Sequence, residues 1–417
     1  MKVLLSAYAC EPGRGTEPGV GWNTAWEMAK YHEVWVLTRP DDGKEAIEAE
    51  LDRHPNPNLH FVYFTLPIFG SLWKQGNSIA FLIHYYFWQI QAFLVARRLH
   101  AEIGFDLAHH VTFVRHSSPS FLALLPIPLI WGPVGGGESA PATFWQDFSF
   151  SNKVYEILRS GIRWVGERDP FARMTAQRSA IARATTEDTA IRMRRMGAHK
   201  VEIFPESSLT SEEILRLTQC SHQTTAVIFI SMGRLLHWKG FHLGLRAFAQ
   251  ADLPAAEYWI LGNGPDRRRL EHLATDLGIA DRVKFVDRLP RDEALTILGS
   301  CTALVHPSLH DSGGWVCLEA MMAARPVLCL NLGGPAVQVT DRTGFRIDAP
   351  DPDRAIQGLA AAMVRLAHDP ELQLAMGLAG QQRIQEFYNW ETRGHQICQL
   401  YADTVKARQI PVESIAQ

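Results

Sequence analysis

Short apolar runs alternate with longer amphipathic stretches along most of the chain. Such a run, bounded by turn residues and followed by a helical pattern, is typical of a buried strand in a parallel sheet. The runs that predict strands in the first half are 3–7, 33–38, 60–66, 105–112, 127–131, 180–185 and 201–204. Those in the second half are 227–232, 257–261, 283–286, 303–305 and 326–330. The pattern therefore predicts an α/β protein with two series of βα units.

The two series are separated by a polar stretch rich in Ser, Thr and Glu, from Pro205 to Thr225. A chain of 417 residues is long enough for two domains. We interpret the polar stretch as the end of the first domain and as the hinge. The predicted division is a first domain at 1–205, a second at 206–389 and a final helical segment at 390–417.

Composition narrows the class of protein. Hydrophobic residues make up 47% and the net charge is −3, so nothing indicates a nucleic-acid partner. The six cysteines have no CxxC spacing, which favours buried thiols in a reducing cytosol over a disulfide framework. The first residues run directly into a predicted strand, so we expect no signal peptide and a cytoplasmic protein. We expect no cofactor and no metal, because no well-spaced cluster of His, Asp and Glu is present.

The aromatic stretch 79–95 is borderline in length for a membrane span. His84, Gln89 and Gln91 interrupt it. We interpret it as a helix packed on a sheet. The alternative is that its aromatic face contacts the inner membrane face or a lipid-linked acceptor.

Glycine-rich segments follow two predicted strands of the first half. The segment 10–23 is predicted as a loop with a helix after it at 24–30, and a second glycine run occupies 132–138. Glycine lets a ligand approach the backbone closely, but the spacing is not the G-x-G-x-x-G of a dinucleotide site. The alternatives are an ordinary surface loop and a lip that contacts an acceptor or donor phosphates. The candidate residues of these segments are Gly15, Glu17, Gly19, Gly21, Gly135 and Gly136.

Two cations flank a loop after the first strand of the second half. Arg234 follows Gly233, and Lys239 precedes Gly240. Arg offers a bidentate fork and Lys a compact charge, so together they can neutralise a diphosphate. A second glycine turn, containing Gly262 and Gly264, follows the next strand.

An acidic pair brackets the stretch between the strand at 303–305 and a predicted helix at 317–324. Asp311 precedes Gly313 and Gly314, and Glu319 stands about one turn into the helix. The start of a helix suits a phosphate, and a carboxylate there can accept two hydrogen bonds from ribose hydroxyls.

Two histidines, His109 and His110, end a predicted strand. Because successive strand residues point to opposite faces, the pattern leaves open which ring faces a site. A structural role and a functional role are both open for this pair.

These motifs resemble those of retaining glycosyltransferases of family four. Seven residues separate Asp311 from Glu319, as in the E-x7-E element of that family, and the Arg234 and Lys239 loop resembles its diphosphate-binding pair. Further similarities are Asp106-x-x-His109, Gly132-Pro133-Val134-Gly135-Gly136-Gly137, Gly262-Asn263-Gly264-Pro265 and the aromatic element at Trp390. The chain departs from the family at four positions, with Asp311 for Glu, Gly313 for an aromatic residue, Val111 for a second His and Val337 for an acid. The resemblance covers nearly the whole chain and is strongest from 226 to 345.

The resemblance implies a GT-B fold, in which two Rossmann-like, doubly wound parallel-sheet domains face a cleft and the last helix crosses back to the first domain. It also implies retaining transfer of a hexose from a UDP- or GDP-sugar to a glycan or lipid-linked acceptor, in polysaccharide biosynthesis and without a metal. The residues implied to be catalytic are Arg234, Lys239, Asp311, Glu319, His109 and His110. Those implied to bind the donor are Gly233, Gly262, Gly264, Gly313, Gly314, Trp315 and Val316. The alternatives are a nucleotide-sugar epimerase or phosphorylase on a similar double fold, and a nucleotide-sugar-binding protein without catalysis.

Overall fold

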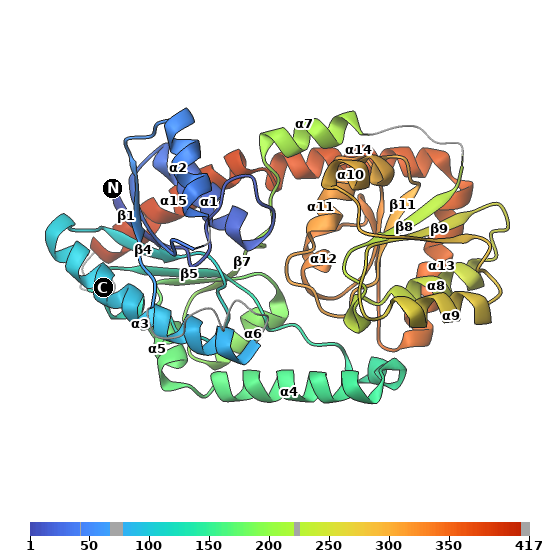
Figure 1. Cartoon of the computed structure of the whole chain (residues 1–417), viewed down its shortest axis with the longest axis horizontal. Helices are drawn as coiled ribbons and strands as arrows, with labels where there is room; N and C mark the ends of the chain where they lie inside the picture. The colour runs from blue at the N-terminus through green and yellow to red at the C-terminus, as the bar shows by residue number, and fades with distance from the viewer. Residues whose placement is uncertain (42, 67–77, 221–225, 410–417) are drawn as a thin grey trace, which may run out of the picture. The chain divides into compact units, whose positions relative to one another are not determined.

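The computed structural model describes residues 1–41, 43–66, 78–220 and 226–409. It divides the chain into two compact units, each with its own sheet (Figure 1). The first unit consists of Met1–Gly137, Arg159–Glu206 and Arg393–Gln417, and the second of Glu138–Leu158 and Ser207–Thr392. Of the predicted segments, 221–225 of the polar stretch and 410–417 of the last segment lie outside the described residues.

The first unit has a parallel sheet in the order β3-β2-β1-β4-β5-β6-β7. Its strands are β1 Lys2–Ser6, β2 Glu33–Thr38, β3 Leu59–Tyr63, β4 Leu107–His110, β5 Leu129–Val134, β6 Ile181–Ala184 and β7 Val201–Ile203. Its helices are α1 Glu17–Ala29, α2 Lys44–Arg53, α3 Ser78–Ile103, α5 Pro170–Arg178, α6 Glu187–Arg195 and the 3₁₀ helix η2 Phe121–Leu124. The strand order reverses beside β1, which is the hallmark of a doubly wound sheet.

The second unit repeats this architecture with the parallel order β10-β9-β8-β11-β12-β13. Its strands are β8 Ile228–Met232, β9 Glu257–Leu261, β10 Val283–Val286, β11 Ala303–His306, β12 Val327–Leu330 and β13 Gly344–Ile347. Its helices are η3 Ala142–Asp147, α7 Ser211–Gln219, η4 His237–Lys239, α8 Phe241–Ala251, α9 Arg267–Asp276, α10 Arg291–Gly299, α11 Trp315–Met322, α12 Gly333–Gln338, α13 Pro352–His368 and α14 Pro370–Phe387. Two helices, α4 Phe150–Gly166 and α15 Trp390–Gln409, contain residues of both units. The predicted α/β class with two parallel sheets is confirmed.

Segment 138–158 is part of the second unit although it precedes the first unit's last strands. Its side chains Phe144 and Phe148 are buried in the same apolar cluster as Phe229 of β8 and Phe248 of α8. Burying a phenylalanine side chain contributes about 1.5–3 kcal/mol, so this segment is integral to the second core.

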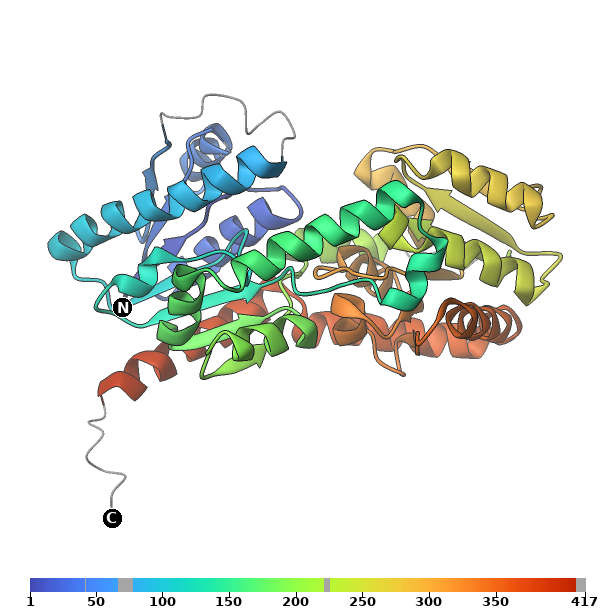
Figure 2. The same cartoon turned by 90° about the horizontal axis from the view of Figure 1, so that it is seen from below.

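The aromatic helix of the first unit is α3, drawn in light blue in Figure 2. Tyr85, Trp88 and Ala92 are buried in a cluster with Leu4 and Ala108 of the sheet. The prediction that this stretch packs on a sheet is therefore confirmed. Among the described residues, no helix is both long enough and apolar enough to cross a membrane.

The predicted loop 10–23 is wrong in its second part, because α1 begins at Glu17 and includes Gly19 and Gly21. Proline fits the first turn of a helix, so Pro18 lies in the first turn of α1 rather than prolonging the loop. A Cβ on Gly21 would lie 2.4 Å from the carbonyl oxygen of Ala9. Close packing against the chain after β1 thus requires a glycine, which sequence reasoning took for a loop residue.

The polar stretch 205–225, which the sequence predicted to hold the hinge, contains α7. Thr210 and Glu213 form a capping box: the Thr210 hydroxyl accepts from the Glu213 backbone N–H, and the Glu213 carboxylate accepts from the Thr210 N–H. The polar composition belongs to an exposed, capped helix.

Candidate active site

The candidate donor loops of the second unit lie together because their strands are neighbours. They leave the carboxyl ends of β9, β8 and β11, which are adjacent in the sheet. A Cβ on Gly262 would lie 2.0 Å from the carbonyl oxygen of Gly233, and one on Gly240 would lie 1.9 Å from that of Pro307. Glycine is thus required where these loops touch. In doubly wound sheets, ligands bind at this edge.

Lys239 and Asp311 form an ion pair across two of these loops. The Lys239 Nζ is 2.5 Å from the Asp311 Oδ2, and the His306 Nε2 is 3.1 Å from the same oxygen. Burial disfavours the charged carboxylate, but the Lys239 ammonium and the His306 hydrogen bond outweigh it and hold the pKa of Asp311 well below its usual range. Asp311 is therefore a carboxylate at neutral pH. Burial, reinforced by the charge of Lys239, lowers the pKa of His306.

Arg234 lies in the loop after β8, and its side chain is exposed. Within the described ranges, its guanidinium makes no ion pair or hydrogen bond with another side chain. It is therefore available to bind an anion from solvent.

Glu319 lies on α11 and is only 8% exposed. Its Oε1 is 2.8 Å from an Nη2 of Arg291, which also contacts the Glu213 Oε1 at 2.8 Å. Burial raises the pKa of Glu319, the nearby Glu213 charge adds to the rise, and Arg291 opposes it.

The two glycines before α11 are fixed by side chains of the same unit. The Gly313 carbonyl oxygen accepts from the Ser207 hydroxyl at 2.6 Å and from the Gln338 side-chain amide at 2.5 Å. Gly314 has a φ of +54° at the N-cap of α11. Trp315 and Val316 are the first two residues of α11, and both are half-buried. The amide groups that begin α11 are thus held in place beside Asp311.

His109 and His110 of the first unit point to opposite faces of its sheet, and each is 1% exposed. The His109 Nδ1 is 2.6 Å from the Tyr401 hydroxyl on α15, and its Nε2 is 2.6 Å from the Gly132 carbonyl oxygen. The His110 Nε2 is 3.1 Å from the Tyr85 hydroxyl on α3. Burial lowers the pKa of each ring to about 3, so both rings are neutral at physiological pH.

The glycine segments of the first unit converge on residues 113–115. The Glu17 Oε2 accepts from the Phe113 backbone N–H at 2.8 Å, and the Gly135 N–H donates to the Val114 carbonyl oxygen at 2.9 Å. Burial raises the pKa of Glu17 to about 7, although the Phe113 N–H and Arg115 oppose the rise. Gly15 lies in the loop before α1, and Gly136, with a φ of +85°, follows Gly135.

Several residues of the site were not found by sequence reasoning. They are His306 beside Asp311, Arg291 beside Glu319, and Ser207 and Gln338 beside Gly313. His306 ends a buried strand, which is a usable signal because a polar residue there faces the ligand edge. The others come from distant segments, and no local pattern identifies them.

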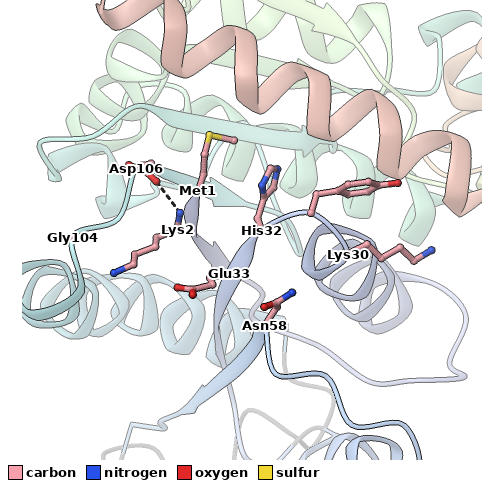
Figure 3. A pocket seen from close by; sticks show the side chains of 9 residues that line it. Met1, Lys2, Lys30, His32, Glu33, Asn58, Gly104 and Asp106 are labelled. Carbon is pink, nitrogen blue, oxygen red and sulfur yellow. Dashed lines mark hydrogen bonds between the residues drawn. The ribbon is translucent and has the colours of Figure 1, made fainter.

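A hollow of about 610 Å³ in the first unit lies elsewhere (Figure 3). Lys2, His32, Glu33 and Asp106 are among its lining residues, and the Lys2 backbone N–H donates to Asp106 at 2.8 Å. These residues lie at or just before the starts of β1, β2 and β4. Because parallel sheets bind ligands at the other end, we do not assign the candidate site to this hollow.

Comparison with known proteins agrees with the fold. Residues 219–383 match the family described as "Glycosyl transferases group 1". The lipopolysaccharide core biosynthesis glycosyltransferase LpsE of Rhizobium meliloti (strain 1021) is 32% identical over 160 residues, 38% of this chain and 45% of that protein. The D-inositol 3-phosphate glycosyltransferase of Corynebacterium urealyticum is 32% identical over 215 residues, 49% of each chain. This chain thus spans about half the length of these curated relatives.

Solved structures match over nearly the whole chain. Anabaena Alr3699/HepE in complex with UDP and glucose has a TM-score of 0.60 at 19% identity, covering 97% of this chain and 100% of that one. The lipopolysaccharide outer core galactosyltransferase WaaB in its apo form has a TM-score of 0.63 at 13% identity, covering 98% and 100%.

Two Rossmann-like units, with cations and acids gathered at the carboxyl edge of the second sheet, define a protein of the GT-B class. Residues 219–383 of the chain are similar to the glycosyl transferases group 1 family. The predicted fold class is therefore confirmed, and the predicted family resemblance is supported over residues 219–383.

Proposed function

We propose that this protein is a retaining glycosyltransferase that moves a hexose from a nucleotide diphosphate sugar to a glycan or lipid-linked acceptor. The observation that carries the proposal is the Lys239–Asp311 pair, 2.5 Å apart, with the exposed Arg234 in the same loop as Lys239 at the carboxyl edge of the second sheet. Cations at this edge fit a diphosphate, and acids there fit sugar hydroxyls.

Arg234 and Lys239 stabilise the negative charge that grows on the diphosphate as it leaves. The carbon–oxygen bond between sugar and phosphate breaks, and its electron pair stays with the phosphate oxygen. The acceptor hydroxyl attacks the same face of the sugar, and its proton passes to the departing phosphate oxygen. Retention of configuration follows from this front-face geometry.

Asp311 accepts hydrogen bonds from the transferred sugar, because Lys239 and His306 keep it ionised. Glu319 accepts from the ribose hydroxyls, with Arg291 compensating its buried charge. The amide groups at the start of α11, from Gly313 to Val316, orient sugar and phosphate. His109 and His110, which the resemblance implies to be catalytic, are buried, neutral rings of the first unit.

Relatives suggest the donor and acceptor classes. A relative from Corynebacterium glutamicum, 29% identical over 205 residues, is named as a GDP-mannose-dependent phosphatidylinositol monomannoside mannosyltransferase. The HepE structures hold UDP or UDP-glucose, and LpsE is named for lipopolysaccharide core synthesis. We therefore propose a UDP- or GDP-hexose as donor and a lipid-linked glycan as acceptor.

A binding protein without catalysis is the second candidate. The observation that favours it is that one oxygen of Asp311, the shorter acid in place of Glu, already contacts both Lys239 and His306. Such a protein would bind a nucleotide sugar without turning it over. An epimerase would release nucleotide but would not depend on an acceptor.

The test is nucleotide release from UDP-glucose, UDP-galactose, UDP-N-acetylglucosamine, GDP-mannose and GDP-fucose, with and without membrane glycolipid and EDTA. We expect release from one donor, increased by glycolipid and unchanged by EDTA. Binding without release under every condition would favour the binding protein. Release that glycolipid does not increase would favour the epimerase.

A further inference from the structure

A buried acid of the second unit contacts both loops that carry the proposed diphosphate site. Glu156, on the part of α4 that belongs to this unit, is 1% exposed. The His237 Nε2 is 3.1 Å from its Oε1, and the His310 Nε2 is 3.2 Å from the same oxygen. Both histidines are also buried.

The chemistry of the cluster fixes the direction of these hydrogen bonds. When Glu156 is ionised its carboxylate only accepts, and both rings then donate an N–H from Nε2 to it. Each ring is thereby held in one tautomer and in one orientation. Loss of the carboxylate would take a shared hydrogen-bond partner from two buried rings, so the three groups depend on one another.

The two histidines are close in sequence to the proposed binding residues. His237 precedes Lys239 by two residues in the loop after β8, and His310 is adjacent to Asp311 after β11. With so few residues between them, a shift of either ring displaces the neighbouring charged side chain.

Aromatic side chains also connect the loop that carries Lys239 with the loop that carries Asp311. Trp238 stacks on His310 with ring centroids 5.1 Å apart, and Tyr155 stacks on Trp238 at 5.4 Å. The Leu309 backbone N–H donates to the Trp238 carbonyl oxygen at 2.8 Å. The two loops are therefore joined by backbone and by side chains, with Glu156 as their shared acceptor.

We propose that Glu156 is a positioning residue that holds the Lys239 loop and the Asp311 loop in register for the diphosphate. The inference rests on the proposed function, because it assumes that these loops bind a nucleotide diphosphate. Apolar residues of similar volume could fill such a buried position without loss of stability, so stability alone does not explain the cluster. Glu156 lies outside the family match at 219–383, so that match does not assign it a role.

The experiment measures binding of UDP and GDP to the full chain by calorimetry, and the KM for donor and acceptor in the transfer assay. Glu156→Leu removes the acceptor oxygen, and Glu156→Gln retains one. Ile157→Ala is the matched control, because the adjacent Ile157 is 58% exposed. Melting temperatures are measured for each variant.

We expect Glu156→Leu to weaken nucleotide binding about tenfold or more and to raise the donor KM, because misplacement by about 1 Å can lose about 100-fold in rate. The acceptor KM should stay unchanged. Glu156→Gln should bind within about threefold of the original protein, since its oxygen still accepts from the histidines. Ile157→Ala should bind normally.

Normal nucleotide affinity and donor KM in a folded Glu156→Leu variant would overturn the inference and leave the proposed function intact. If the original chain binds neither nucleotide, the proposed function fails and this inference fails with it. If Glu156→Leu does not fold, His310→Gln is compared with His310→Leu. Gln keeps an N–H donor for Glu156, so equal nucleotide affinity in the two would overturn the inference.

Discussion

Lys239 is the residue on which the proposed chemistry most directly depends. Its ammonium contacts Asp311 at 2.5 Å, and the two side chains are 22% and 17% exposed. The pair is thus sheltered from solvent but still open to a ligand. We expect the Lys239 ammonium to stabilise the leaving diphosphate more than it stabilises the folded state.

We predict that Lys239→Ala lowers the transfer rate about 100-fold or more, because the positive charge that stabilises the leaving diphosphate is lost. The melting temperature should fall by only about 2–5 °C. Steady-state kinetics and calorimetry check both values. Lys284→Ala, which removes an exposed lysine paired with Glu257 in the same unit, is the control and should have no effect on transfer. Normal transfer by Lys239→Ala would remove Lys239 from the site.

Glu17 offers a test of burial in the first unit. Burial raises its pKa to about 7 in the folded chain, above the usual value of about 4.3. The folded state therefore binds this proton more tightly than the unfolded state does. The free energy of unfolding should fall as pH rises from about 4 to about 7 and should then level off.

We predict that Glu17→Gln removes this fall and is more stable than the original protein at pH 8 by about 1 kcal/mol or more. Denaturant unfolding from pH 4 to pH 8 measures it. Glu33→Gln, at the exposed start of β2, is the control. Parallel stability curves for Glu17→Gln and the original chain would contradict the raised pKa.

At the scale of elements, the start of α11 depends on a glycine. Gly314 has a φ of +54°, and a Cβ there would lie 2.6 Å from the Gln338 Oε1. Gly278 also has a positive φ, +68°, but a Cβ there would meet nothing within 4 Å. An alanine at Gly278 therefore measures the free-energy cost of the left-handed backbone alone. An alanine at Gly314 adds the cost of the clash with Gln338.

We predict that Gly278→Ala destabilises the second unit by about 1 kcal/mol, the cost of a left-handed residue with a Cβ. Gly314→Ala should cost more and should weaken nucleotide binding, because Gln338 must move away from Gly313. Denaturant unfolding and calorimetry measure the two effects. Equal stability losses with unchanged binding would mean that the Gln338 contact has no role.

Most elements could be predicted from the sequence because buried parallel strands are nearly continuous apolar runs. The runs 33–38, 257–261 and 283–286 coincide with β2, β9 and β10. The start of α1 could not, because Gly19 and Gly21 read as loop residues until their close contacts are known. The helix α7 could have been found from Thr210 and Glu213, which form a recognisable capping box.

The candidate site was predictable only where its residues are close in sequence. Asp311 and Glu319 share one strand-turn-helix segment, so their pattern is local. The contact between Lys239 and Asp311 requires that β8 and β11 be neighbours, which the order of strands in the sequence does not give. Glu156 is 81 residues from His237, and no periodicity connects them.

At the scale of the whole molecule, each buried apolar cluster of the described residues lies within a single unit. We predict two calorimetric unfolding transitions. UDP or GDP should move only the transition of the second unit to higher temperature. A nucleotide concentration of 100 times the Kd adds about 2.7 kcal/mol to the free energy of unfolding of that unit. Glu17→Gln should shift only the other. A single transition that moves as a whole would contradict two independently unfolding units.

The place of residues 138–158 has a consequence for recombination between relatives. A chimera that exchanges everything after residue 206 would combine the larger part of a foreign second unit with the resident Phe144, Phe148 and Glu156. Those side chains would then meet non-matching partners in the core and beside His237 and His310. Transplanting donor specificity therefore requires two inserted pieces, 138–158 and 207–392, rather than one crossover. Natural exchange at a single point should be selected against for the same reason.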